Sequence, residues 1–264
     1  MTYLGTGPML SHEFLLACGA SRERQFDDFW KISIGLGQQG RTITKEKIQI
    51  TDNDGLTPRN SMTAVASGKK VLLFAGQDSE KSLLFNDLYE LDLETKALKQ
   101  IDSKDGKVVP PIRNSHSMTK LNDKKIIVFG GANEEGPLKD LYELDVETKE
   151  FVKVKLDQTD EILPMIEMHS AHIYKGTHLL IIGGRSLEVG KPLNEIAFSD
   201  TIYAIDLTTY KVSIFGKLPS ALGSHVSAII DDKYLIVYGG TNGYRFFDSI
   251  LRYDIEEKEW TLMT

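Results

Sequence analysis

The sequence predicts an all-β fold built from repeated four-stranded units, and two observations lead to it. A short apolar run that ends in small residues recurs along the chain, at intervals of roughly fifty residues. Each run is followed by a segment of alternating apolar and polar residues, a turn and a further short strand. No apolar periodicity of the helical kind extends over the length of a helix. Because a unit of four short strands cannot bury both of its faces alone, we expect the units to stack side by side.

The four strands of a unit follow one another in a fixed order. The first strand precedes the apolar run, and in three units it opens with a histidine, at His116, His169 and His225. The second strand is the apolar run, which covers 14–19, 72–76, 126–131, 179–184 and 234–240. The third is the alternating segment, which covers 27–33, 86–92, 139–145, 200–206 and 248–254. An acidic residue and a turn then lead to the fourth strand, as in 149–154 and 258–262.

This spacing defines five units, or blades. They cover 2–57, 58–109, 110–163, 164–218 and 219–264. Radial stacking of such blades gives a closed β-propeller, so we expect a single propeller domain over 1–264. Five blades are recognisable. Six are possible, because the pattern would not detect a degenerate copy or a blade that further sequence supplies.

The repeated pattern resembles that of the kelch family. The residues that carry the resemblance are 113–117 (RNSHS), the glycine pairs, 141–145 (LYELD) and the late Trp260. It extends over nearly the whole chain. Two features depart from it: the first unit has 17–19 (ACG) in place of a glycine pair, and the late tryptophan is replaced elsewhere by Leu98, Phe151 and Ile214. The resemblance implies a kelch β-propeller that serves as a non-catalytic protein–protein interaction module or scaffold.

Composition narrows the partners and the compartment. The net charge of −7 argues against binding to nucleic acid. No run of 18 apolar residues occurs, so no membrane insertion is expected. Cys18 is the only cysteine and no Asn-x-Ser/Thr sequon is present, which favours a reducing, intracellular compartment, the cytoplasm. The oligomeric state is left open.

Three short motifs suggest cofactor or metal chemistry, and each has a structural explanation that we favour. The segment 35–40 (GLGQQG) matches a dinucleotide fingerprint, but the residues after it read as a strand rather than the helix that the fingerprint requires. His169 and His172 stand three apart, which puts them on opposite faces of a strand. The segment 52–55 (DNDG) begins like a calcium loop, but Thr63 stands at the twelfth position. We therefore expect no catalytic residues, no metal and no cofactor.

Antiparallel alternation predicts where a partner binds. In a four-stranded blade, the loop between the second and third strands and the loop to the next blade emerge on the same face. Six of the eight arginines fall in these loops: Arg22, Arg24, Arg59, Arg113, Arg185 and Arg245. Three aromatic residues accompany the last of them: Tyr244, Phe246 and Phe247. We expect these nine residues to bind another protein, through an acidic segment of that partner, since arginine forks match carboxylates and arginine with aromatics is typical of hot spots.

Two alternatives stay open. Arg59 and Arg113 can instead tie blades together through internal salt bridges. The function can instead be that of a sugar-binding or sialic-acid mutarotase-like kelch enzyme, because galactose oxidase and the bacterial sialic-acid mutarotases share this architecture, although no residue set of either can be carried over. The long apolar loop 185–199 is expected to fold over the binding face and shape it.

Overall fold

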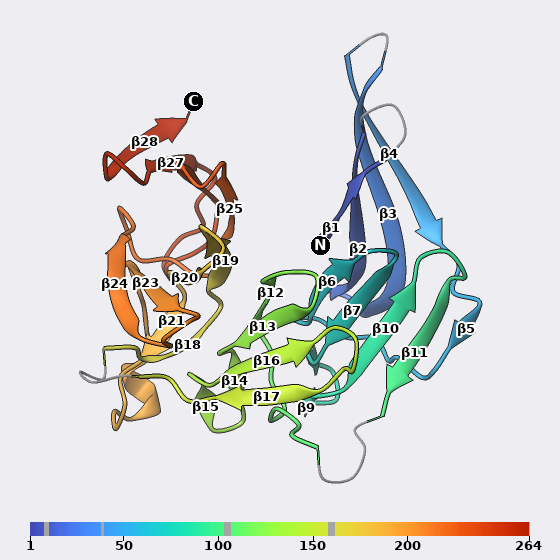
Figure 1. The fold of residues 1–264 in the computed structure, drawn as a ribbon, viewed down its shortest axis with the longest axis horizontal. Coiled ribbons are helices and arrows are strands. Elements are labelled where there is room, and N and C mark those ends of the chain that lie inside the picture. The colour runs from blue at the N-terminus through green and yellow to red at the C-terminus, as the bar shows by residue number, and fades with distance from the viewer. Residues whose placement is uncertain (8–10, 38–39, 103–106, 158–161, 264) are drawn as a thin grey trace. The chain divides into compact units, whose positions relative to one another are not determined.

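The computed structural model describes residues 1–7, 11–37, 40–102, 107–157 and 162–263. The chain divides into two compact units, Met1–Asn114 and Ser115–Thr264. Both are built mainly from four-stranded antiparallel arrays, so the predicted all-β fold of repeated four-stranded units is confirmed (Figure 1). No helix in the described ranges is long and apolar enough to cross a bilayer. The single domain and the closed ring depend on how the two units are placed, and they stay predictions.

The unit Met1–Asn114 contains two blades. Blade 1 consists of β1 (Thr2–Thr6), β2 (His12–Ala20), β3 (Gln25–Gly37) and β4 (Gly40–Ile48), in that spatial order. Blade 2 consists of β6 (Thr63–Ser67), β7 (Lys70–Phe74), β10 (Leu88–Asp92) and β11 (Ala97–Ile101). The short strand β5 (Asp52–Asn53) pairs in parallel with β11, and β8 (Gln77–Asp78) and β9 (Leu83–Leu84) form a small hairpin in the loop between β7 and β10.

The unit Ser115–Thr264 contains three blades. Blade 3 consists of β12 (Ser117–Lys120), β13 (Lys125–Phe129), β16 (Leu141–Asp145) and β17 (Phe151–Val154). Blade 4 consists of β19 (Ser170–Tyr174), β20 (His178–Ile182), β23 (Thr201–Asp206) and β24 (Val212–Lys217). Blade 5 consists of β25 (Val226–Ile230), β26 (Tyr234–Tyr238), β27 (Ile250–Asp254) and β28 (Glu259–Met263).

The small strands of this unit lie in loops. They are β14 (Ala132–Asn133), β15 (Gly136–Pro137), β18 (Met165–Glu167), β21 (Arg185–Leu187) and β22 (Ala197–Phe198). The first two form a hairpin, and the other three form a sheet in the order β18-β21-β22.

In β7, β13 and β20 the second strand is a continuous apolar run because both of its faces are buried. In β20, Leu179 and Ile181 pack in a cluster with blade 3, whereas Leu180 and Ile182 pack in a cluster with blade 5. In the other unit, Leu15 and Phe29 of blade 1 pack in the same way against blade 2. Successive blades within a unit are therefore joined by apolar clusters made from alternate residues.

A glycine pair closes the joint between blades 3 and 4 and the joint between blades 4 and 5. The backbone at Gly130 is left-handed, with φ 61°, and a Cβ atom there would lie 2.7 Å from the carbonyl oxygen of Ile166. The N–H of the next residue, Gly131, donates to that same carbonyl at 2.9 Å. Glycine is required here for both its backbone conformation and its lack of a side chain. The equivalent bond runs from Gly184 to the carbonyl of Leu222 at 2.8 Å.

The loops meet as the alternation argument predicts. The segment that enters blade 4 forms β18, which pairs with β21 in the loop between β20 and β23. The segment that enters blade 5 is bridged to the loop of its own blade through Gly223 and Thr241. In the other unit, Asn60 is bridged to Gln77 in the same manner. Within each unit, the inter-blade segments and the loops between second and third strands share one face.

Candidate functional site

Arg59, predicted to bind a partner, is buried inside the unit Met1–Asn114. Its side chain is 2% exposed, and its Nη1 lies 2.6 Å from the Asp87 Oδ1. The guanidinium also donates to the backbone carbonyls of Thr57 and Ala75, and it stacks on the Phe85 ring at 3.8 Å. A charge held in this way stabilises the fold and is not offered to a partner. The alternative of an internal salt bridge is the better description of Arg59.

Arg113 occupies the same position one blade later and is also buried. Its residue exposure is 0%, and its Nε donates to the carbonyl of Pro111 at 3.1 Å. Its own carbonyl accepts the N–H of Gly76, as the carbonyl of Arg59 accepts the N–H of Gly19. Both arginines are therefore parts of the internal packing of the unit Met1–Asn114, and we leave them out of the proposed surface.

Arg185 is half-exposed and already paired. It stands opposite Glu167 in the β18–β21 ladder, and its Nε and Nη2 both donate to the Glu167 Oε1, at 3.1 and 2.5 Å. Because the carboxyl of Glu167 is buried, the arginine mainly neutralises that group.

Arg22 and Arg24 are exposed in the turn between β2 and β3. The N–H of Arg24 donates to the Ser21 Oγ at 3.2 Å, and its guanidinium lies 4.8 Å from the Phe26 ring centroid. These two arginines belong to one unit, and Arg185 and Arg245 belong to the other. The nine predicted residues are thus divided between two units.

The loop between β26 and β27 presents the most exposed aromatic side chains of the described residues. Tyr244 is 97% exposed and Phe246 is 88% exposed. Hydrogen bonds within the loop fix its conformation. The N–H groups of Tyr244 and Arg245 donate to the Asn242 Oδ1, each at 3.1 Å. The Thr241 hydroxyl donates to the carbonyl of Arg245 at 2.9 Å. The Arg245 guanidinium is exposed and lies 4.7 Å from the Phe247 ring centroid.

The loop 185–199 folds into ordered structure on its own unit. It forms β21, a 3-10 turn over Leu193–Glu195, and β22. Leu187 is buried, and the side chain of Leu193 lies against Gly136 in the loop of blade 3. Phe198 lies between Gly223 and Gly243, and so joins this loop to the loop of blade 5.

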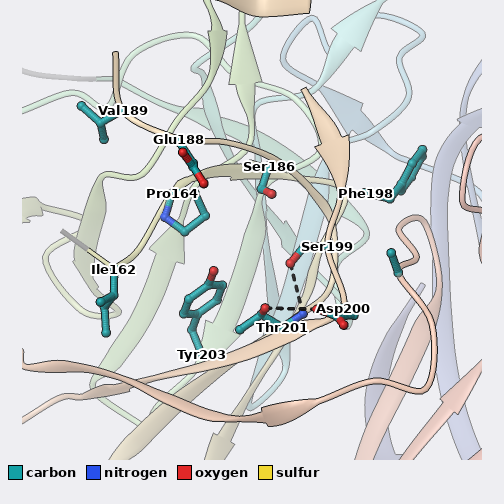
Figure 2. A pocket seen from close by; sticks show the side chains of 11 residues that line it. Ile162, Pro164, Ser186, Glu188, Val189, Phe198, Ser199, Asp200, Thr201 and Tyr203 are labelled. Carbon is teal, nitrogen blue, oxygen red and sulfur yellow. Dashed lines mark hydrogen bonds between the residues drawn. The ribbon is translucent and has the colours of Figure 1, made fainter. Parts of the chain in front are cut away.

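Beside this loop lies an open pocket of about 690 Å³ (Figure 2). It is lined by hydroxyl and carboxylate groups together with a few apolar side chains: Ile162, Pro164, Ser186, Glu188, Val189, Phe198, Ser199, Asp200, Thr201, Tyr203 and Ala221. The hydroxyl of Tyr203 points into the opening in Figure 2. Burial, with the carboxylates of Asp200 and Glu188 nearby, raises the pKa of Tyr203, so the group stays a neutral phenol. The pocket offers several hydrogen-bond acceptors and donors to a polar ligand.

The motifs that suggested cofactor or metal chemistry take part in strand pairing and in contacts between blades. The segment 35–40 continues β3 into β4, with Gly37 opposite Gly40, so a strand follows the glycines; residues 38 and 39 lie outside the described residues. His169 and His172 reach opposite neighbours, Ser117 in blade 3 and Ser227 in blade 5. In the described ranges, no group of three or more His, Cys, Asp or Glu side chains is arranged to hold a metal ion.

The remaining motif and the lone cysteine also have structural roles. Asp52 and Asn53 form β5, where Asp52 pairs with Lys99 and the Asn53 Oδ1 accepts the N–H of Leu56. Cys18 is buried in a left-handed conformation, with φ 55°, where blade 2 has Ala75 and blades 3 to 5 have glycine. Burial raises the pKa of its thiol to about 12, so the side chain is a poor nucleophile.

Comparison with known proteins decides the family. The model of the KLHDC2/KLHL20/DRC7 Kelch-repeats domain matches residues 9–159 and 61–264. The chain belongs to the kelch-repeat family. Kelch repeats generally mediate protein–protein interaction and are typically not catalytic.

Several curated relatives are less than 30% identical to this chain over the aligned residues. Acyl-CoA-binding domain-containing protein 4 of Arabidopsis thaliana is 29% identical over 70% of this chain and 27% of its own length. Adagio-like protein 1 of Oryza sativa subsp. japonica is 27% identical over 78% of this chain and 33% of its own. Kelch domain-containing protein 10 of Xenopus tropicalis is 28% identical over 60% of this chain and 39% of its own. The chain therefore spans only about a quarter to two fifths of these relatives.

The kelch repeat itself contains the signal that Arg59 and Arg113 are buried. Both stand four residues ahead of the first strand of their blade, where blades 4 and 5 have Ile166 and Leu222. All four side chains are buried. A position that is apolar in some repeats is a core position in all of them, and its arginines need internal partners.

Proposed function

We propose that this protein is a non-catalytic protein-binding module whose partner contacts the loop 241–247 of blade 5. The observation that carries the proposal is the near-complete exposure of Tyr244 and Phe246 on a loop with fixed hydrogen bonds. Large aromatic side chains on a rigid support lose little conformational entropy on binding and are typical of interface hot spots. We place the protein inside the cell, because its one cysteine is a free, buried thiol.

The partner's chemistry follows from the charge beside these rings. Arg245 is exposed and has no carboxylate partner among the ion pairs of the described residues. Its planar fork matches a carboxylate, and stacking on Phe247 holds it in place. We therefore propose a partner segment that combines apolar side chains with at least one acidic residue. The support for a strongly acidic segment is weaker than the sequence suggested, because Arg59, Arg113 and Arg185 have internal partners.

Replacing Arg245 by Ala should weaken partner binding by more than about 1 kcal/mol, and replacing Tyr244 or Phe246 by Ala should weaken it by at least as much. The affinity should also fall as salt rises, because part of the attraction is between exposed charges. The partner is first captured from native lysate and identified by mass spectrometry, and its affinity for each purified variant is then measured by calorimetry.

Lysines on the opposite hairpins provide the matched controls. Lys124 and Lys233 lie in turns between first and second strands, and their replacement by Ala should leave the affinity unchanged. Melting temperatures show that the variants fold. Normal binding by the Arg245, Tyr244 and Phe246 variants would remove this loop from the proposal and leave only the fold.

A second candidate function is suggested by the polar pocket of Figure 2. Hydroxyl groups at Ser186 and Thr201, with carboxylates at Glu188 and Asp200, suit a ligand rich in hydroxyl donors. The two carboxylates disfavour an acidic sugar such as sialic acid and favour a neutral one. Neutral sugars should raise the melting temperature and sialic acid should not; stabilisation by sialic acid, with faster interconversion of its anomers, would establish the mutarotase alternative instead.

A further inference from the structure

All the residues that line the polar pocket of Figure 2 belong to the unit Ser115–Thr264. They come from the segments that enter blades 4 and 5, from the loop between β20 and β23, and from β23 itself. Blade 4 packs against blade 3 on one side and against blade 5 on the other, and all three blades belong to this unit. The described walls of the pocket therefore come from one unit, with a blade of that unit on either side.

Tyr203 contributes a buried hydroxyl group to this pocket. The residue is 8% exposed, and its hydroxyl points into the opening (Figure 2). The nearby Thr201 hydroxyl donates its proton to the Asp200 Oδ1 at 3.3 Å, so it has none to donate to the phenol oxygen. The oxygen of Tyr203 is therefore left with acceptor positions for a ligand.

The charged groups on the pocket wall are acidic. Glu188 and Asp200 line the pocket, and no lysine, arginine or histidine of the described residues does so. Asp200 is paired with Lys217 at 3.3 Å. Lys191, in the same loop as Glu188, is paired with Glu195, and Glu188 has no cationic partner in the described part of the chain. A free carboxylate beside hydroxyl oxygens favours a cation with several N–H donors.

Phe198 connects the pocket to the loop 241–247. Its ring lines the pocket, and a Cβ atom built on Gly243 would lie 3.1 Å from the Phe198 Cε2. Gly243 directly precedes Tyr244, which is 97% exposed. A partner segment that contacts the loop can therefore extend across Phe198 into the pocket.

We propose that this pocket binds an arginine side chain of the partner polypeptide. The guanidinium donates to the carboxylate of Glu188 and to the hydroxyl oxygen of Tyr203, since both are acceptors that no cation of the described residues occupies. The proposal rests on the proposed protein-binding function, and it gives the partner segment an arginine for the pocket in addition to the acidic residue for Arg245. It assigns the pocket to that segment and not to a neutral sugar.

The probe for this site is N-acetyl-arginine amide. Added to the full, isotope-labelled chain, it should shift the amide NMR signals of Ser186, Glu188 and Thr201 in a saturable way. N-acetyl-citrulline amide has nearly the same shape without the charge, and it should bind at least about ten-fold more weakly, because hydrogen bonds to charged groups are the stronger ones. Glu188→Gln should weaken binding of the arginine probe by about ten-fold for the same reason, and Tyr203→Phe should also weaken it.

Matched variants separate the pocket from the loop site and from unfolding. Glu195→Gln makes the same change of charge in the same loop but lies outside the pocket, so binding of the probe should be unchanged. Arg245→Ala should also leave it unchanged, so a failure of the loop proposal and a failure of this one are distinguishable. Melting temperatures are compared to confirm that each variant folds. Equal binding of the arginine and citrulline probes, an absence of saturable shifts, full binding by Glu188→Gln, or displacement of the probe by an equal concentration of glucose overturns the proposal.

The identified partner provides a second test, by a double-mutant cycle. Replacing the arginine of its contact segment by Gln should weaken binding to the wild-type chain by about ten-fold. The same replacement should weaken binding to Glu188→Gln much less, because the two changes remove one shared interaction. Additive losses, or a contact segment without an arginine, overturn the proposal.

Discussion

Replacing Asp87 by Ala should lower the free energy of unfolding of the unit Met1–Asn114 by about 3–5 kcal/mol, because it leaves a buried arginine without its counter-charge. Arg59 is almost fully buried and its Nη1 lies 2.6 Å from the Asp87 Oδ1. The remaining bonds of the guanidinium go to Thr57 and to the carbonyl of Ala75. They satisfy donors but do not neutralise the charge. A loss of this size is a large fraction of the stability of a typical domain.

The repeat supplies a rescue for this variant. Because Ile166 and Leu222 occupy the position of Arg59 in blades 4 and 5, an aliphatic side chain fits that position when the charge pair is removed. The double variant Arg59→Leu/Asp87→Ala should therefore be clearly more stable than Asp87→Ala alone. Lys69→Ala, which removes an exposed ion pair with Glu94, should change little.

Tryptophan fluorescence can follow each unit separately in urea. Trp30 lies in the unit Met1–Asn114 and Trp260 lies in the other, and the chain has no further tryptophan. In a Trp260→Phe background, Trp30 is the one remaining tryptophan, and its fluorescence reports the unfolding of the unit Met1–Asn114. An unchanged unfolding midpoint in Asp87→Ala, or a double variant no more stable than the single one, would contradict this account of Arg59.

The strands of each blade could be predicted from sequence because local pattern and burial agree. The run 126–131 is apolar at successive positions, residues 126–129 are all buried, and it ends in glycines that the joint with blade 4 requires. Alternation in 139–145 reflects a third strand with unequal faces. These signals lie within a few residues of one another, so one sequence suffices to read them.

The chemistry of the predicted site could not be read in the same way. Whether an arginine is free to bind a partner depends on residues elsewhere in the chain. Glu167 neutralises Arg185 because the segment that enters blade 4 forms β18, which pairs with β21. The sequence of this segment, 165–167 (MIE), shows no alternation that predicts a strand. The exposure of Tyr244 and Phe246 was predictable, because they follow a glycine in the loop between two predicted strands.

Acid should destabilise the unit Ser115–Thr264 more than the other, because three of its histidines, two buried and one half-buried, are held as neutral rings. The Nε2 atom of His169 is hydrogen-bonded to the Ser117 hydroxyl at 2.9 Å. The Nε2 atom of His225 is hydrogen-bonded to the Ser170 hydroxyl, and that of His172 to the Ser227 hydroxyl, each at 2.7 Å. The buried Nδ1 atoms of His169 and His225 have no hydrogen-bond partner in the described residues. Burial lowers the pKa of His169 to about 3 and the pKa of His172 and His225 to about 4.

The direction of the effect follows from proton uptake on unfolding. An unfolded histidine has a pKa near about 6.5, so below that pH the unfolded state binds protons that the folded state refuses. Stability is complete above about pH 7 and falls as the pH drops from about 6.5 towards 4. At about pH 5 each such histidine costs up to about 2 kcal/mol. The carboxylates of Asp145 and Asp206, whose pKa is lowered by backbone N–H bonds, lose their contribution only below about pH 4.

The measurement compares the two units in urea at about pH 7 and about pH 5. In a Trp30→Phe background, Trp260 should report a large fall in the unfolding midpoint of the unit Ser115–Thr264. In a Trp260→Phe background, Trp30 should report a much smaller one, because the one histidine of Met1–Asn114, His12, is exposed. His169→Gln keeps a side chain that can bond to Ser117 but cannot take up a proton, so it should reduce the pH dependence even if it lowers stability at about pH 7. Equal shifts in both units, or a His169→Gln variant with the full pH dependence, would show that the buried histidines are not its source.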